Sequence, residues 1–329
     1  MRTKIIIVIL LLYQTCSYSK TNEINEFNQE YLSSYFSALI AYDNQNNVDA
    51  LKFFKSSKKL IKIHDNFLRE YVFSLVLDGQ VKKAIDQIKI SQNKTNSNFF
   101  EANLLLVLDS FYKKKYKQAA KRLEKFENFQ DNQNFQFVIY KSLESYNNVF
   151  LNKKIENNNN FGKLSLINLT FQNCYLNSSK TNSNFLNLIN DDQGDYSRYL
   201  FFYLGNVIEN NEHEVANEIS STIEPLSNSL LISQAKKWIE DKKYKKFNKY
   251  FSCKNENDLL SEFFYLISNL FSTQEMFEKS NFYLSISNYL NQKFYFNLSL
   301  LAENYYLNNN FDLAKKTLSK FDDQDRIYY

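Results

Sequence analysis

The chain has 329 residues, of which four are Gly and one is Pro, and its 40 basic and 36 acidic side chains give a net charge of +4. This shortage of Gly and Pro excludes β-sandwiches, barrels and propellers, which use both residues at their many turns, and Rossmann or P-loop enzymes, which need Gly-rich turns. The balanced charge argues against nucleic-acid binding and a hydrophobic content of 44% argues against disorder, so an almost wholly helical protein remains.

Residues 1–19 predict a secretory signal peptide. Arg2 and Lys4 precede the aliphatic run Ile5–Leu12, and small residues in Ser17-Tyr18-Ser19 occupy the two positions that a signal peptidase recognises. The aliphatic run is too short to span a bilayer as a stable helix. We therefore expect an exported protein of the periplasm or cell envelope, with an uncleaved N-terminal anchor as the alternative.

The cysteines leave two alternatives open. Cys16 lies before the predicted cleavage point, and its acylation would make the chain a lipid-anchored protein, although Tyr13-Gln14-Thr15 matches a lipoprotein context poorly. Cys174 and Cys253 remain in the mature chain, 79 positions apart. We interpret them as buried thiols, and a single disulfide is the alternative in an oxidising compartment.

A fixed-period pattern runs through the rest of the chain. A large apolar residue, two polar residues, a small residue and another large apolar residue recur in Val81–Ile88, Tyr116–Leu123 and Phe311–Leu318. The small-residue positions are 50, 84 and 119, then 247, 280 and 314, which are 33 to 35 residues apart within each group. Positions 152, 185 and 216 continue the period between the groups, and Asn152 fits it least well. Such a period indicates stacked supersecondary units.

A second small residue lies twelve positions before several of these positions. Ala38 precedes Ala50, Ser268 precedes Ser280, and Ala302 precedes Ala314. Small residues on two antiparallel helices let the backbones approach closely, while large neighbours fill the space between units. We therefore predict about nine helix pairs between residues 27 and 321, with an Asn-rich loop over 147–160.

The period and the small/large pattern resemble the tetratricopeptide repeat (TPR), a helix–turn–helix unit. The first hundred residues further resemble envelope TPR proteins of alphaproteobacteria, in the spacing of Tyr31, Ala38, Ala41 and Tyr42 and of Leu75, Leu77, Gly79 and Ala84. The resemblance implies an all-α solenoid of antiparallel helix pairs in a right-handed superhelix. Its parts would be an N-terminal lobe over 27–148, degenerate repeats or a linker over 149–195, and a C-terminal lobe over 196–321.

In a TPR superhelix the first helix of each pair lines the concave face, where a partner segment binds. Residues placed around the small position of each first helix would point there, and aromatic and polar side chains can hold a peptide. The expected partner-binding residues are Tyr35, Tyr42, Arg69, Phe73, Phe111, Tyr265 and Tyr306.

Two basic runs, Lys113–Lys117 and Lys242–Lys249, stand at predicted turns between paired helices. A solvated outer face explains such runs, and contact with anionic lipid or an acidic partner is the functional alternative. A solvated face requires no binding partner, whereas the functional alternative predicts peripheral membrane contact through these lysines.

The sequence offers no catalytic or metal-binding pattern. His64 and His213 are the two histidines, neither lies near a cysteine, and no zinc-ligand spacing or nucleophile motif occurs. We therefore expect no enzyme, no metal and no cofactor. The predicted function is a protein-interaction scaffold or adaptor of the cell envelope. The alternatives are a subunit that positions a cell-wall or polysaccharide enzyme, and an outer-membrane assembly lipoprotein.

Overall fold

The computed structural model describes residues 29–91, 97–129, 135–156, 160–191, 197–223 and 230–321. Every regular element in these ranges is a helix, and none of the helices there is long and apolar enough to cross a membrane. The predicted signal peptide over 1–19 and Cys16 lie outside the described residues.

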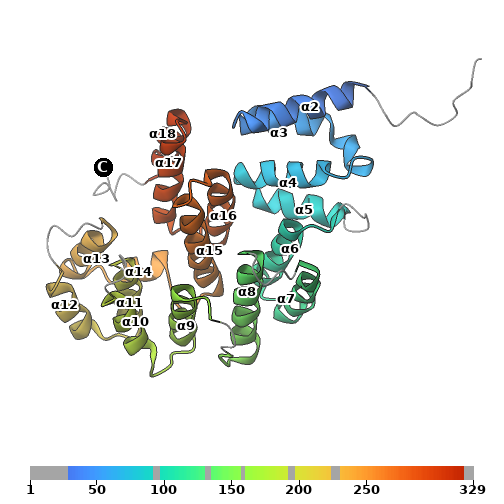
Figure 1. The fold of residues 1–329 in the computed structure, drawn as a ribbon. Helices are drawn as coiled ribbons and strands as arrows, with labels where there is room; N and C mark the ends of the chain where they lie inside the picture. The colour runs from blue at the N-terminus through green and yellow to red at the C-terminus, as the bar shows by residue number, and fades with distance from the viewer. Residues whose placement is uncertain are drawn as a thin grey trace, which may run out of the picture. The chain divides into compact units, whose positions relative to one another are not determined.

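The chain divides by its internal contacts into two compact units, residues 1–64 and 65–329, which we describe separately. In the first unit, α2 (Gln29–Asp43) and α3 (Asn47–Ser56) form a helix pair, and the 3-10 turn η1 (Lys58–Lys62) follows (Figure 1). The predicted small residues Ala38 and Ala50 are both completely buried, as close packing of the two helices requires.

The second unit begins with two helix pairs and one long helix. Within the pairs, α4 packs on α5 and α6 packs on α7, and the predicted small residues Ala84 and Ala119 are completely buried. These elements are α4 (Phe67–Leu77), α5 (Val81–Ser91), α6 (Phe100–Tyr112), α7 (Tyr116–Leu123), η3 (Glu124–Phe129) and α8 (Phe135–Asn152).

Helix α8 corrects the first part of the predicted loop over 147–160, since residues 147–152 are helical, whereas 153–156 have no regular structure and 157–159 lie outside the described residues. The helix continues to Asn152 because Val149 and Phe150 are buried, and the Phe150 ring packs edge-on against Phe111 at 5.9 Å. The predicted boundary between residues 148 and 149 therefore falls inside a helix. Asn152 is exposed at the end of α8, whereas the small-residue position of a helix pair predicts a buried residue there.

The middle of the second unit contains two further pairs, α9 with α10 and α11 with α12, followed by α13 and α14. Ala216 of α12 is completely buried, and Phe247 of α14 packs on Trp238 of α13 at 5.5 Å between ring centroids. The elements are α9 (Lys163–Tyr175), α10 (Thr181–Ile189), α11 (Ser197–Glu209), α12 (His213–Ser221), α13 (Leu230–Glu240) and α14 (Lys245–Tyr250).

A disulfide joins Cys174 at the end of α9 to Cys253 in the connection after α14, with the two Cα atoms 5.7 Å apart. Both residues are buried. The interpretation of these cysteines as unbonded thiols is therefore wrong, and the alternative of a single bridge is the one that the structure forms.

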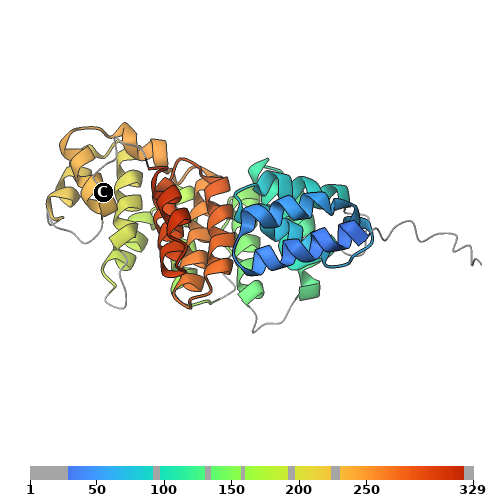
Figure 2. The same ribbon diagram turned by 90° about the horizontal axis from the view of Figure 1, so that it is seen from above.

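The chain ends in two helix pairs that lie side by side, α15 with α16 and α17 with α18 (Figure 2). Ser268 and Ser280 are completely buried in the first of these pairs, and Ala302 and Ala314 are buried in the second. The elements are α15 (Glu256–Ser272), α16 (Phe277–Leu290), η4 (Tyr295–Asn297), α17 (Leu298–Leu307) and α18 (Phe311–Leu318).

The α15–α16 pair also packs on helices that lie far from it in the sequence. Helix α16 contacts α4 and α5, and α15 contacts α6 and α9. Phe282 packs on Phe73 with ring centroids 4.7 Å apart, and Tyr289 stacks on Tyr112 at 5.1 Å. A repeat array in which each unit touches only its neighbours has no such contacts. The chain's own C-terminal helices therefore cover part of the surface of its earlier first helices.

Candidate functional site

Two of the seven predicted partner-binding residues lie in the core. Tyr35 is 3% exposed and its ring packs on Phe54 and His64, while Phe111 is completely buried between Tyr116 and Phe150. Side chains so enclosed offer almost no surface to a partner. Their positions are those of residues that stabilise the helix packing.

Two more of the seven contact other parts of the chain. The Phe73 ring lies against Phe282 of α16, and the Tyr265 ring lies 3.9 Å from the guanidinium carbon of Arg198. Both side chains are half-buried. Phe73 and Tyr265 thus occupy surfaces where one part of the chain already contacts another, and the sequence pattern alone gave no sign of these contacts.

Two of the remaining three, Arg69 and Tyr306, have exposed side chains. Tyr42 is half-buried, and Arg69 is exposed with its guanidinium 3.8 Å from the buried carboxylate of Glu101. Tyr306 is 62% exposed, and its ring packs edge-on against the exposed ring of Phe311 at 5.5 Å. Arg69 and Tyr306 are therefore the members of the predicted set that a partner can reach most easily, and their binding role stays a prediction.

A buried ion pair joins α11 to α15, and sequence reasoning did not find it. Arg198 donates hydrogen bonds through Nε and Nη2 to the two oxygens of Glu262, at 2.8 and 2.7 Å. Nη2 also donates to Oδ1 of Asn297. Burial alone lowers the pKa of Arg198, but the Glu262 carboxylate outweighs this effect and raises it. The guanidinium of Arg198 therefore keeps its charge, which suits a structural contact better than proton transfer.

A second polar centre forms around Glu256, the first residue of α15. The hydroxyl of Tyr175 donates to Oε1 of Glu256 at 2.9 Å, and Nζ of Lys114 lies 3.1 Å from Oε2. Burial acts to raise the pKa of Glu256, but hydrogen bonds from its own backbone, Lys114 and the nearby tyrosines lower it overall. This centre attaches the α6–α7 turn and α9 to the start of α15.

The first basic run, Lys113–Lys117, is partly neutralised within the protein. Lys113 and Lys89 both bind the carboxylate of Asp109, at 2.8 and 2.7 Å, and Lys114 pairs with Glu256. Burial acts to raise the pKa of Asp109, but its two lysine partners lower it overall. The predicted membrane contact through this run therefore has fewer uncompensated charges than the sequence suggests.

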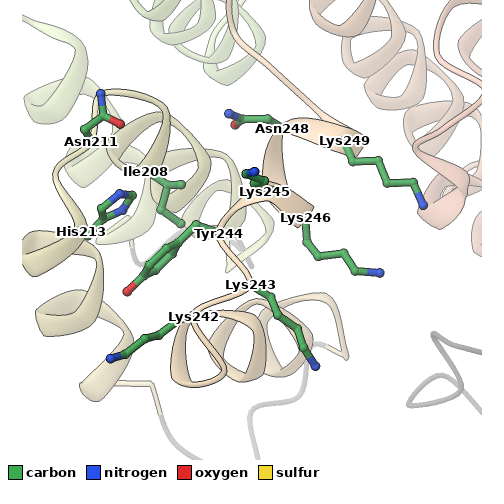
Figure 3. A pocket seen from close by; sticks show the side chains of 10 residues that line it. All are labelled: Ile208, Asn211, His213, Lys242, Lys243, Tyr244, Lys245, Lys246, Asn248 and Lys249. Carbon is green, nitrogen blue, oxygen red and sulfur yellow. The ribbon is translucent and has the colours of Figure 1, made fainter.

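The second basic run lines a pocket of about 630 Å³, which we call the lysine pocket. Figure 3 shows the rings of His213 and Tyr244 beside Ile208, with the lysine side chains spreading outward from the segment 242–249. The His213 and Tyr244 rings stack at 4.2 Å with an angle of 15° between their planes. The lining residues are Ile208, Asn211, His213, Lys242, Lys243, Tyr244, Lys245, Lys246, Asn248 and Lys249.

Among the residues that the structure describes, no carboxylate lines the lysine pocket. Lys243 pairs with Asp241 at 2.8 Å, and the resulting hydrogen bond lowers the pKa of that carboxyl group. The other lysines of the lining form no ion pair with any residue that the structure describes; they are Lys242, Lys245, Lys246 and Lys249. The pocket is therefore a concentration of uncompensated positive charge on a protein whose overall charge is nearly balanced.

The two histidines take separate places. His64 follows η1 in the first unit, and His213 begins α12 at the lysine pocket. Within the described ranges, no group of three or more His, Cys, Asp or Glu side chains is arranged to hold a metal ion. Comparison with known proteins gives no further guidance, because no family, curated protein or solved structure matches the chain.

Proposed function

We propose that this protein is a non-catalytic, TPR-like scaffold or adaptor of the cell envelope that binds a segment of a partner protein. The observation that carries the proposal is the exposed apolar surface at the C-terminal helix pair, formed by Tyr306, Leu307 and Phe311. These three side chains are 62%, 53% and 55% exposed. Large apolar side chains that gather on a surface mark interaction sites more often than scattered ones do.

The helix-pair organisation supports a repeat architecture for this scaffold. Small residues are buried in several helix pairs along the sequence, at Ala50, Ala84, Ala119, Ser280 and Ala314. A terminal repeat normally carries a polar outer face that keeps the array soluble. Helices α17 and α18 carry Tyr306 and Phe311 there instead, which fits a surface that a partner covers.

The disulfide supports the proposed location outside the cytoplasm. Disulfides persist in oxidising compartments and are rare where thiol reductants are abundant. The bridge between Cys174 and Cys253 agrees in this respect with the signal peptide expected from residues 1–19.

Site-specific photo-crosslinking in the source cells tests the proposal. A photoreactive phenylalanine analogue replaces Tyr306 in one strain and Lys316, an exposed residue of α18, in a control strain. We expect a discrete adduct with one partner protein at position 306 and none at 316. The same adducts at both positions, or none at either, would overturn partner binding at this surface.

A variant complements the crosslink. Tyr306→Glu with Phe311→Glu places charge on the apolar surface, while Lys315→Gln with Lys316→Gln makes the same change in net charge at exposed lysines of α18. With the photoreactive analogue at a position other than 306 or 311, we expect the first double variant to lose the crosslink to the partner protein. Its helical circular dichroism should remain that of the wild type.

N-terminal sequencing and mass measurement of the mature protein separately test cleavage after Ser19 against acylation of Cys16.

A further inference from the structure

We propose that the lysine pocket binds a soluble anion that carries several phosphate groups, such as an oligophosphate. This inference does not rest on partner binding at Tyr306, since the two surfaces belong to different helices. It assigns a ligand class to a site that the scaffold function leaves without a role.

The first argument is the contrast between the two basic runs. Their sequences are nearly alike, but the structure provides Asp109 and Glu256 as partners for Lys113 and Lys114. The second run has Asp241 as its one paired carboxylate, on Lys243. Lysines brought together without counter-charges repel one another, and a bound anion removes that repulsion. The lysine pocket therefore has a charge that is unmatched within the described protein.

The second argument concerns the number of charges on the ligand. The ammonium groups spread outward along the segment 242–249, so a single phosphate reaches few of them at once (Figure 3). Lys242, Lys243, Lys245 and Lys249 have exposed side chains that can turn toward the pocket. A chain of linked phosphates presents several anionic groups and can engage lysines along the whole segment.

The third argument favours phosphate over carboxylate and a soluble anion over a membrane. The lining contributes lysines, which bind phosphate as point charges, and a phosphate group carries more negative charge than a carboxylate, so it gains more from several lysines at once. Surfaces that bind membranes through basic residues usually add exposed apolar anchors. Ile208 is the one aliphatic residue of the lining, and it is 4% exposed.

Isothermal titration of the purified full chain with sodium tripolyphosphate tests the proposal. We expect saturable binding that weakens as salt rises from about 50 to 300 mM, because salt screens exposed charges. Lys245→Gln with Lys249→Gln should weaken binding at least about tenfold, on the scale of charge-assisted hydrogen bonds. Lys245→Arg with Lys249→Arg keeps both charges and should retain most of the affinity.

The matched control is Lys115→Gln with Lys117→Gln, which removes two exposed lysines from the other run and changes the net charge equally. This variant should bind tripolyphosphate as the wild type does. Trp238, the single tryptophan, is buried against Phe247 of α14, so its emission reports whether the variants keep this packing.

Three outcomes overturn the proposal. One is the absence of saturable binding at low salt, and another is an equal loss of affinity in the two glutamine variants, which would indicate a diffuse charge effect. The third is binding to vesicles that contain phosphatidylglycerol without binding to tripolyphosphate, which would assign the lysine pocket to a membrane surface. Crosslinking at position 306 is independent of each result.

Discussion

Arg198 and Glu262 form a buried ion pair with two parallel hydrogen bonds, across 64 positions of sequence. The Glu262 side chain is completely buried, and that of Arg198 is 19% exposed. The guanidinium also lies over the rings of Tyr265, Phe202 and Phe294, with its carbon 3.9 to 5.4 Å from their centroids. This single side chain therefore connects α11, α15 and the segment that leads into α17.

The ion pair predicts a strong effect of Glu262→Gln. The substitution leaves the Arg198 charge buried without a counter-charge, and breaking such a pair costs about 3–5 kcal/mol of unfolding free energy. Urea denaturation followed by Trp238 emission measures this loss. Replacing both residues with Met removes the stranded charge, so the double variant should be more stable than the single one.

A control comes from Lys141 and Glu144, which pair at 2.8 Å near the surface of α8. Solvent screens this pair, so Glu144→Gln should cost less than about 1 kcal/mol. A loss for Glu262→Gln no larger than the loss for Glu144→Gln would show that the buried pair does not hold the fold together.

Asp258 predicts a pH-dependent component of stability. Burial raises its pKa to about 7, although the N–H of Ser252 donates to its carboxylate at 3.0 Å and Lys293 also acts to lower the value. The nearby carboxylates of Glu209 and Glu256 act to raise it further. The folded protein thus holds this proton more tightly than the unfolded chain does, and between about pH 4 and 7 the contribution to stability falls as pH rises.

Asp258→Asn removes this titration while keeping an oxygen that can accept the Ser252 hydrogen bond. We expect the variant to gain stability relative to the wild type as the pH rises from 5 to 8, as measured by urea denaturation at each pH. Taking the difference between the two proteins cancels the titration of Glu101, whose pKa is also raised by burial. A difference that stays constant with pH would contradict the prediction.

The sequence predicted the helix pairs of this fold because the small and large apolar residues that pack within each pair recur at a regular spacing. Ala84, Ala119 and Ser280 are buried where the period of small residues placed them. Helix α8 escaped prediction over Asn147–Asn152 because its asparagines resemble those of a loop, whereas burial of Val149 and Phe150 keeps it helical.

Contacts between helices that are distant in the sequence produce no such regular spacing. Phe73 and Phe282 look like ordinary core residues of their own helices, and nothing local indicates that their rings meet. The two basic runs differ for the same reason. Asp109 lies one helical turn before Lys113 and can be found from the sequence, but the Glu256 that binds Lys114 is distant in the chain. The two basic runs therefore look alike in the sequence and differ only in the ion pairs that they form in the folded protein.

The disulfide predicts a large difference between the oxidised and reduced proteins. The bridge closes a loop of 79 residues, and in the chain-entropy description a loop of this size contributes about 4.5 kcal/mol to stability. Cys174→Ala with Cys253→Ala should lower the unfolding free energy by about that amount. Denaturation curves of the wild type should shift to lower stability when a reducing agent is added, whereas those of the variant should not change. Wild-type curves that coincide with and without the reducing agent would contradict the prediction.

Adjacent alanines in α7 offer a direct test of why the repeat positions are small. Ala119 is completely buried, whereas Ala120 is half-buried. Ala119→Leu inserts three carbons into a full space between α7 and its neighbours, and such overpacking costs about 1–3 kcal/mol. Ala120→Leu makes the same chemical change in the same helix, so differences in helix propensity cancel between the variants. We expect thermal unfolding to show a lower midpoint for Ala119→Leu than for Ala120→Leu. Equal midpoints would mean that the helices of this pair can separate to admit a larger side chain, and the period of small residues would then lose its physical explanation in close helix contact.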